Sequence, residues 1–184
     1  MKRIVVCLLC LSLTVLFVAC QKESPKEEPK AEEGNAETSA VSLNGFNFSL
    51  TWGCYGISSY DSKTGKLVKT TDTTHPEDYV TTYRLTAEQK KQIYDLIEGL
   101  RVTNYPAVYD PQGGDMMSSP SMTLVLSVRT DTYQKTIRAE NIALTYNAKN
   151  RKGQKFLDVC KAIENILTET EEWKALPEYE FFYD

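Results

Sequence analysis

Two stretches of the chain alternate between apolar and polar side chains, and they constrain the fold more than any other feature. The first covers residues 46–52 and the second covers residues 122–128. Their apolar members are Phe46, Phe48, Leu50 and Trp52 in the first stretch, and Met122, Leu124, Leu126 and Val128 in the second. Because successive side chains of a strand point to opposite faces of a sheet, this period of two is typical of half-buried strands.

Further strands are predicted around a tight turn. Residues 61–65 read Asp-Ser-Lys-Thr-Gly, which is typical of a hairpin turn in which Gly65 adopts a positive φ. Residues 66–70 would return as the partner strand, and residues 78–84, rich in Tyr and Thr, indicate another. A last strand is predicted at residues 133–139. Strands joined by hairpins favour an antiparallel sheet, because parallel pairs need long crossovers.

Two helices are predicted from their caps and their apolar stripes. Thr86 and Gln89 form a capping-box pattern at the start of the first helix, and Asn150 is the expected cap of the second. The stripes consist of Ile93, Leu96, Ile97 and Leu100 in the first helix, and of Phe156, Val159, Cys160, Ile163, Ile166 and Leu167 in the second. Residues 170–177 indicate one more helical turn, which ends at Pro177.

These elements predict an α+β fold in two layers, with a mainly antiparallel sheet and two amphipathic helices packed on one of its faces. All of them fall in residues 41–184, which have the size of one ordinary domain. We therefore divide the chain into residues 1–19, residues 20–40 and a single globular domain at residues 41–184. The sequence does not specify the order of the strands.

The first 21 residues follow a different pattern. Lys2 and Arg3 precede an uncharged run from Ile4 to Ala19, and Cys20 follows directly. This pattern resembles the signal peptide and lipobox of bacterial lipoproteins, which implies cleavage before Cys20 and acylation of that cysteine. The resemblance implies a lipid anchor in the cell membrane or outer membrane, with the domain facing the periplasm or the exterior. The alternative is an uncleaved transmembrane helix, although the run is shorter than the ~20 residues that a span needs.

Residues 21–40 carry no large apolar side chain, which predicts a disordered acidic tether. Of the 21 basic and 25 acidic residues, 5 and 6 lie before residue 41, which leaves 16 and 19 in the domain. This near balance gives no indication of a nucleic-acid partner. The expected partners are the membrane, through the lipid anchor, and an envelope protein or glycan.

Cys54 and Cys160 are the cysteines that the domain retains. Both fall on predicted core faces, one on a strand and one on a helix, so a disulfide between them is a candidate in an oxidising compartment. The alternatives are inert buried thiols, or a Cys54 nucleophile with His75 as its base. With one histidine and two distant cysteines, the domain lacks zinc-ligand spacing, and no catalytic residue, metal or cofactor is predicted.

Residues 105–120 lie between the first predicted helix and the predicted strand at residues 122–128, and they show no periodicity. A loop of this length is often a binding loop. Tyr105, Tyr109, Met116 and Met117 offer adaptable apolar contacts, which makes this segment a candidate partner-binding loop. The alternative is a connector whose two tyrosines pack against the first helix.

A basic run near the start of the second helix has two interpretations. It contains Lys149, Arg151, Lys152 and Lys155, which either meet an anionic polymer or form a solvated helix start. Together, these features predict an envelope lipoprotein, anchored in a membrane, with a non-catalytic binding or assembly role. The alternative is a small envelope hydrolase that acts on cell-wall glycan or peptide through carboxylates.

Overall fold

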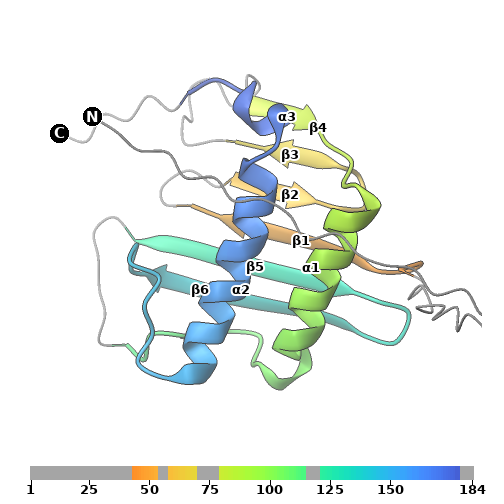
Figure 1. The fold of residues 1–184 in the computed structure, drawn as a ribbon. Coiled ribbons are helices and arrows are strands. Elements are labelled where there is room, and N and C mark those ends of the chain that lie inside the picture. The colour runs from red at the N-terminus through yellow and green to blue at the C-terminus, as the bar shows by residue number, and fades with distance from the viewer. Residues whose placement is uncertain (1–42, 54–57, 70–78, 115–120, 179–184) are drawn as a thin grey trace, which may run out of the picture. The chain divides into compact units, whose positions relative to one another are not determined.

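Six strands form one antiparallel sheet in the computed structural model, which describes residues 43–53, 58–69, 79–114 and 121–178 (Figure 1). The strands are β1 (Asn47–Trp52), β2 (Ser58–Asp61), β3 (Lys66–Val68), β4 (Val80–Thr82), β5 (Met122–Arg129) and β6 (Gln134–Ile142). Their order across the sheet is β4-β3-β2-β1-β5-β6. All of them lie in the unit at residues 41–184, and the predicted signal peptide and tether lie outside the described residues.

The two alternating stretches are neighbours at the centre of the sheet. β1 and β5 run antiparallel, with Phe48 opposite Val128 and Leu50 opposite Leu126. This register places the apolar side chains of both strands on the same face, because residues directly opposite one another in a sheet share a face. The β1–β5 pair joins the first four strands to the β5–β6 hairpin and makes one continuous sheet.

The hairpin between β2 and β3 follows the turn chemistry of its sequence. The Asp61 carboxylate accepts the Thr64 N–H at 2.8 Å, and Gly65 has a φ of +78°. β3 and β4 are shorter than the stretches predicted to contain them. β6 runs three residues beyond its predicted end, past an irregularity in the β5–β6 register between Met122 and Leu124.

Helices α1 (Ala87–Leu100), α2 (Arg151–Thr168) and α3 (Glu171–Lys174), with the short 3₁₀ helix η2 (Val102–Asn104), complete the fold. The capping box of α1 is confirmed, since the Thr86 hydroxyl accepts the Gln89 N–H at 3.1 Å and Gln89 Oε1 accepts the Thr86 N–H at 3.0 Å. Asn150 caps α2 by accepting the Gly153 N–H at 2.8 Å. The predicted extra turn is α3, which Thr170 caps.

α1 and α2 lie side by side across one face of the sheet, which confirms the predicted two-layer α+β fold (Figure 1). Their apolar stripes and the inward side chains of the strands form one core. Its fully buried members include Leu50, Tyr60, Leu67, Ile93, Ile97, Leu124, Leu126, Ile137, Phe156, Leu157, Cys160 and Ile163. Among the described residues, no helix has both the length and the apolar character that crossing a membrane requires.

Candidate functional site

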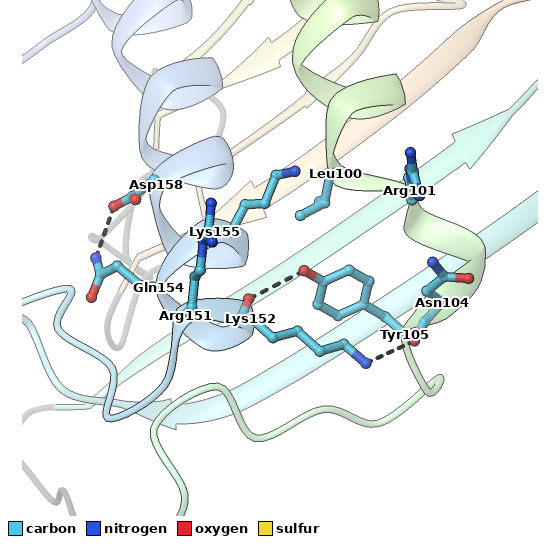
Figure 2. Close-up of a pocket in the computed structure, with 9 residues that line it drawn as sticks. All are labelled: Leu100, Arg101, Asn104, Tyr105, Arg151, Lys152, Gln154, Lys155 and Asp158. Carbon is cyan, nitrogen blue, oxygen red and sulfur yellow. Dashed lines mark hydrogen bonds between the residues drawn. The ribbon is translucent and has the colours of Figure 1, made fainter.

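An open pocket of about 740 Å³ lies between the end of α1 and the start of α2 (Figure 2). One wall comes from α1 and η2, and the other from the first turns of α2. The lining residues are Leu100, Arg101, Asn104, Tyr105, Arg151, Lys152, Gln154, Lys155 and Asp158. Four of these side chains are cations and one is a carboxylate, so the pocket is strongly cationic.

The α1 wall depends on an unusual helix end. Arg101 follows α1 in a left-handed conformation, with φ 57° and ψ 60°, and its N–H donates to the Glu98 carbonyl at 3.0 Å. Glycine is the usual residue at such a position, because a side chain makes this conformation less favourable. The reversal leads directly into η2, so Arg101 and Asn104 reach the same pocket.

The two lysines of the pocket hold its walls together. Lys155 Nζ donates to the Gly99 carbonyl at 2.5 Å, and Lys152 Nζ donates to the Asn104 carbonyl at 2.9 Å. Both carbonyls lie near the C-terminal end of α1, where cations are favoured by the helix dipole. Lys152 Nζ also lies 4.7 Å from the ring centre of Tyr105. These contacts fix both lysines as positive charges at defined positions.

The two arginines have no such contacts. In the part of the chain that the structure describes, neither the Arg101 nor the Arg151 guanidinium makes a hydrogen bond or an ion pair, and both residues are exposed. The single carboxylate of the lining, Asp158, accepts a hydrogen bond from Gln154 Nε2 at 2.8 Å. The guanidinium groups are therefore available to an anion from solution.

The structure places the tyrosines of the candidate partner-binding loop against α2. Tyr105 is 4% exposed, and its hydroxyl donates to the Lys152 carbonyl at 3.2 Å. Its ring centre lies 5.0 Å from that of Tyr109, and both rings pack on Phe156. Burial raises the pKa of both tyrosines. The alternative interpretation expected this packing on the first helix, but the helix that the rings contact is α2.

The next residues of the loop dock onto the edge of the sheet. The Tyr109 N–H donates to the Arg138 carbonyl at 2.9 Å, and the Arg138 N–H donates to the Ala107 carbonyl at 2.8 Å. Val108 thereby forms a parallel bridge with Arg138 of β6. This part of the loop is therefore held in place, whereas Met116 and Met117 lie outside the described residues.

The structure describes one of the two cysteines of the domain. Cys160 is a free thiol, fully buried on α2, and burial, together with the nearby Glu164 carboxylate, raises the pKa of its thiol. Since the thiolate is the reactive form, this burial disfavours reaction at Cys160 in the folded domain. Cys20, Cys54 and His75 lie outside the described residues, so lipidation, the Cys54–Cys160 disulfide and the Cys54–His75 pair stay predictions.

Over the described ranges, no group of three His, Cys, Asp or Glu side chains is arranged to hold a metal ion. The Asp110 carboxylate precedes Gly113 and Gly114 in the chain. It accepts the backbone N–H groups of Gln112 and Gly113, both at 2.9 Å. It therefore stabilises its own turn.

Three of the four cations of the pocket, Arg151, Lys152 and Lys155, belong to the predicted basic run, while Lys149 is not part of the lining. Arg101, which caps the end of α1, was not predicted from the sequence. A signal was present, because the predicted first helix ends with a charged residue where glycine is commoner.

The fold and the pocket define this chain as an α+β domain with a cationic surface pocket, an arrangement suited to binding anions. The sequence matches no protein-family model, and comparisons with curated proteins and with solved structures found no match.

Proposed function

We propose that this protein is a lipid-anchored lipoprotein of the bacterial envelope whose domain has a non-catalytic role in binding an anionic envelope component. The anchor is the acylated Cys20, followed by the tether at residues 21–40. The pattern of the first 21 residues supports the anchor. The proposed location is the cell membrane or outer membrane, with the domain facing the periplasm or the exterior.

One observation carries the binding role. Two guanidinium groups without a described partner, Arg101 and Arg151, line one open pocket together with two lysines. Exposed cations on one patch repel each other, and a bound anion offsets this repulsion. The partner would be an envelope protein or glycan that presents a negatively charged group to the pocket.

The contacts of the acidic side chains give the alternative hydrolase no specific support. Glu164 is the most buried ion-paired carboxylate described, with a side chain 14% exposed. It accepts the Tyr146 hydroxyl at 2.6 Å and pairs with Lys161 at 3.0 Å. Both of its oxygens are thus engaged, one in a contact that joins α2 to the preceding segment and the other in an ion pair within α2.

A photo-crosslinking residue at Asn104 tests the binding role in intact cells. Asn104 is exposed and lines the pocket, and its backbone carbonyl, the atom that Lys152 contacts, is unchanged by the substitution. We expect a discrete adduct that disappears when Arg101 and Arg151 are both replaced. The matched control places the same crosslinker at Glu88, an exposed residue in the first turn of α1.

The same adduct at Glu88, or no adduct at Asn104, would contradict the binding role. Turnover of cell-wall material by the purified protein, unaffected by replacement of Arg101 and Arg151, would favour the hydrolase instead.

The anchor has a separate test. Cys20→Ala should release the protein from membranes or leave the precursor uncleaved, since acylation requires the thiol. Normal processing and normal acyl labelling of this variant would exclude the lipid anchor.

A further inference from the structure

We propose that the cationic pocket recognises phosphoryl groups through Arg101 and Arg151, and that its ligand carries at least two phosphoryl groups. This inference rests on the proposed binding function, and it specifies the chemistry of the anion. It concerns a phosphorylated small molecule or the phosphorylated part of a larger envelope component.

Two locally unfavourable features of the chain enrich the pocket in positive charge. Arg101 occupies a left-handed position that favours glycine. The first turn of α2 contains Arg151 and Lys152 and no acidic residue, although the N-terminal end of a helix favours negative charge. A bound anion would offset both the repulsion among the cations and their conflict with the helix end.

The two guanidinium donors lie on opposite walls of the pocket. Arg101 approaches from the wall that follows α1, whereas Arg151 approaches from α2 on the other wall (Figure 2). A guanidinium binds phosphate or carboxylate oxygens through two parallel N–H groups. The oxygens of a phosphoryl group spread tetrahedrally and accept from several sides, while the two oxygens of a carboxylate lie in one plane. Donors on two walls therefore fit the phosphoryl group better.

The volume and the positive charge of the pocket fit a ligand larger than one phosphate. The pocket volume of about 740 Å³ falls in the range of sites for whole small ligands, roughly 300–1,000 Å³, and exceeds what one phosphate fills. Four cations line this space, and a single phosphoryl group carries at most two negative charges. Lys152 and Lys155 already donate hydrogen bonds to backbone carbonyls. They therefore supply positive charge without losing further side-chain entropy when a ligand binds.

Calorimetric titration of the full-length protein in a non-ionic detergent provides the test. The probes are inorganic tripolyphosphate, inorganic phosphate and tricarballylate, which carries three carboxylates. We expect tripolyphosphate to bind more tightly than either of the others, with an affinity that falls as salt is added.

Two variants remove one guanidinium each. Arg101→Gly also relieves the left-handed backbone, so it should melt no lower than the wild type while binding tripolyphosphate about tenfold more weakly. Arg151→Gln should weaken binding by a similar factor. The matched control is Arg84→Gln, an exposed arginine just before α1, one helix length of about 20 Å from the pocket. It should bind as the wild type does.

Equal affinity of wild type and both pocket variants, or an equal loss in the Arg84→Gln control, would overturn the proposal. Tighter binding of tricarballylate than of tripolyphosphate, lost in the pocket variants, would overturn the phosphoryl assignment and leave the anion-binding function standing. If none of the probes binds and the adduct at Asn104 is also absent, the proposed function fails as well.

A further titration identifies the source of the phosphoryl groups once tripolyphosphate binding is established. Detergent micelles that contain cardiolipin, a lipid with two phosphoryl groups, compete with tripolyphosphate if the ligand is a lipid headgroup. No competition assigns a soluble phosphorylated compound or chain instead.

Discussion

The side-chain carbonyl of Gln112 accepts the backbone N–H of Ala143 at 2.8 Å, and both residues are buried. Its Nε2 donates to the Asn147 carbonyl, also at 2.8 Å, and the residue is only 1% exposed. One glutamine thus pairs two backbone groups of the segment between β6 and α2. Through it, the loop that follows η2 is joined to the segment that leads into the pocket wall.

Gln112→Ala should lower the free energy of unfolding by about 2–4 kcal/mol, because it leaves two backbone groups without their partner. Equilibrium denaturation in urea measures this change. Gln92→Ala, at an exposed position of α1, is the control and should change stability by less than about 0.5 kcal/mol. A similar small change in both variants would show that water replaces the contacts of Gln112.

Two helical glycines should respond to alanine in opposite directions. A Cβ at Gly153 would lie 2.0 Å from the Pro111 carbonyl oxygen, so Gly153→Ala should separate α2 from the loop and cost about 1–3 kcal/mol. A Cβ at Gly99 would meet nothing within 4 Å, so Gly99→Ala should stabilise the domain by about 0.5–1 kcal/mol through helix propensity. Thermal melting of the two variants measures these opposite changes in stability. Destabilisation by Gly99→Ala would contradict the open space around Gly99.

The domain should lose stability in alkaline solution through Tyr60. Burial raises the pKa of Tyr60 from 10.0 to about 12, and the residue is 1% exposed. Between these values the unfolded chain loses the phenolic proton while the folded domain keeps it, so the folded state binds more protons. The contribution of Tyr60 to the free energy of unfolding is therefore complete below pH 10. It falls by up to about 1.4 kcal/mol per pH unit as the pH rises to 12.

Tyr60→Phe checks this contribution. At neutral pH the variant should be about 1 kcal/mol less stable, because the Tyr60 hydroxyl no longer donates to the Tyr83 carbonyl. Its stability should fall less steeply than that of the wild type between about pH 10 and pH 12. A constant difference between the two proteins over this interval would contradict the raised pKa.

Cys160 is a free thiol in the structure, and the candidate Cys54–Cys160 disulfide is tested on protein exported to an oxidising compartment. If the disulfide forms, alkylation of the unfolded, unreduced protein should modify neither residue, and reduction should lower the free energy of unfolding by about 2–4 kcal/mol. Modification of Cys160 without prior reduction would exclude the disulfide. In reduced, folded protein the Cys160 thiol should resist alkylation, because it is buried and its pKa is raised.

Local features of the sequence were sufficient to predict most of the elements. Thr86, Gln89 and Asn150 cap their helices through contacts within three residues, so the helix starts follow from short-range chemistry. The alternation of the two central strands matches their burial, since each inward side chain is apolar. The segment after η2 was harder to predict, because its hydrogen bonds go to β6 and to residues 143–147.

The sequence by itself determined where the two long helices and the two central strands begin, which of their faces are apolar, and that the fold is α+β, since propensity, caps and periodicity are local properties. Tertiary structure alone decided that β1 pairs with β5 and that Arg101 and Arg151 line one pocket. These relationships connect residues far apart in the chain. They arise from the joint burial of the strand and helix faces, which local patterns do not specify.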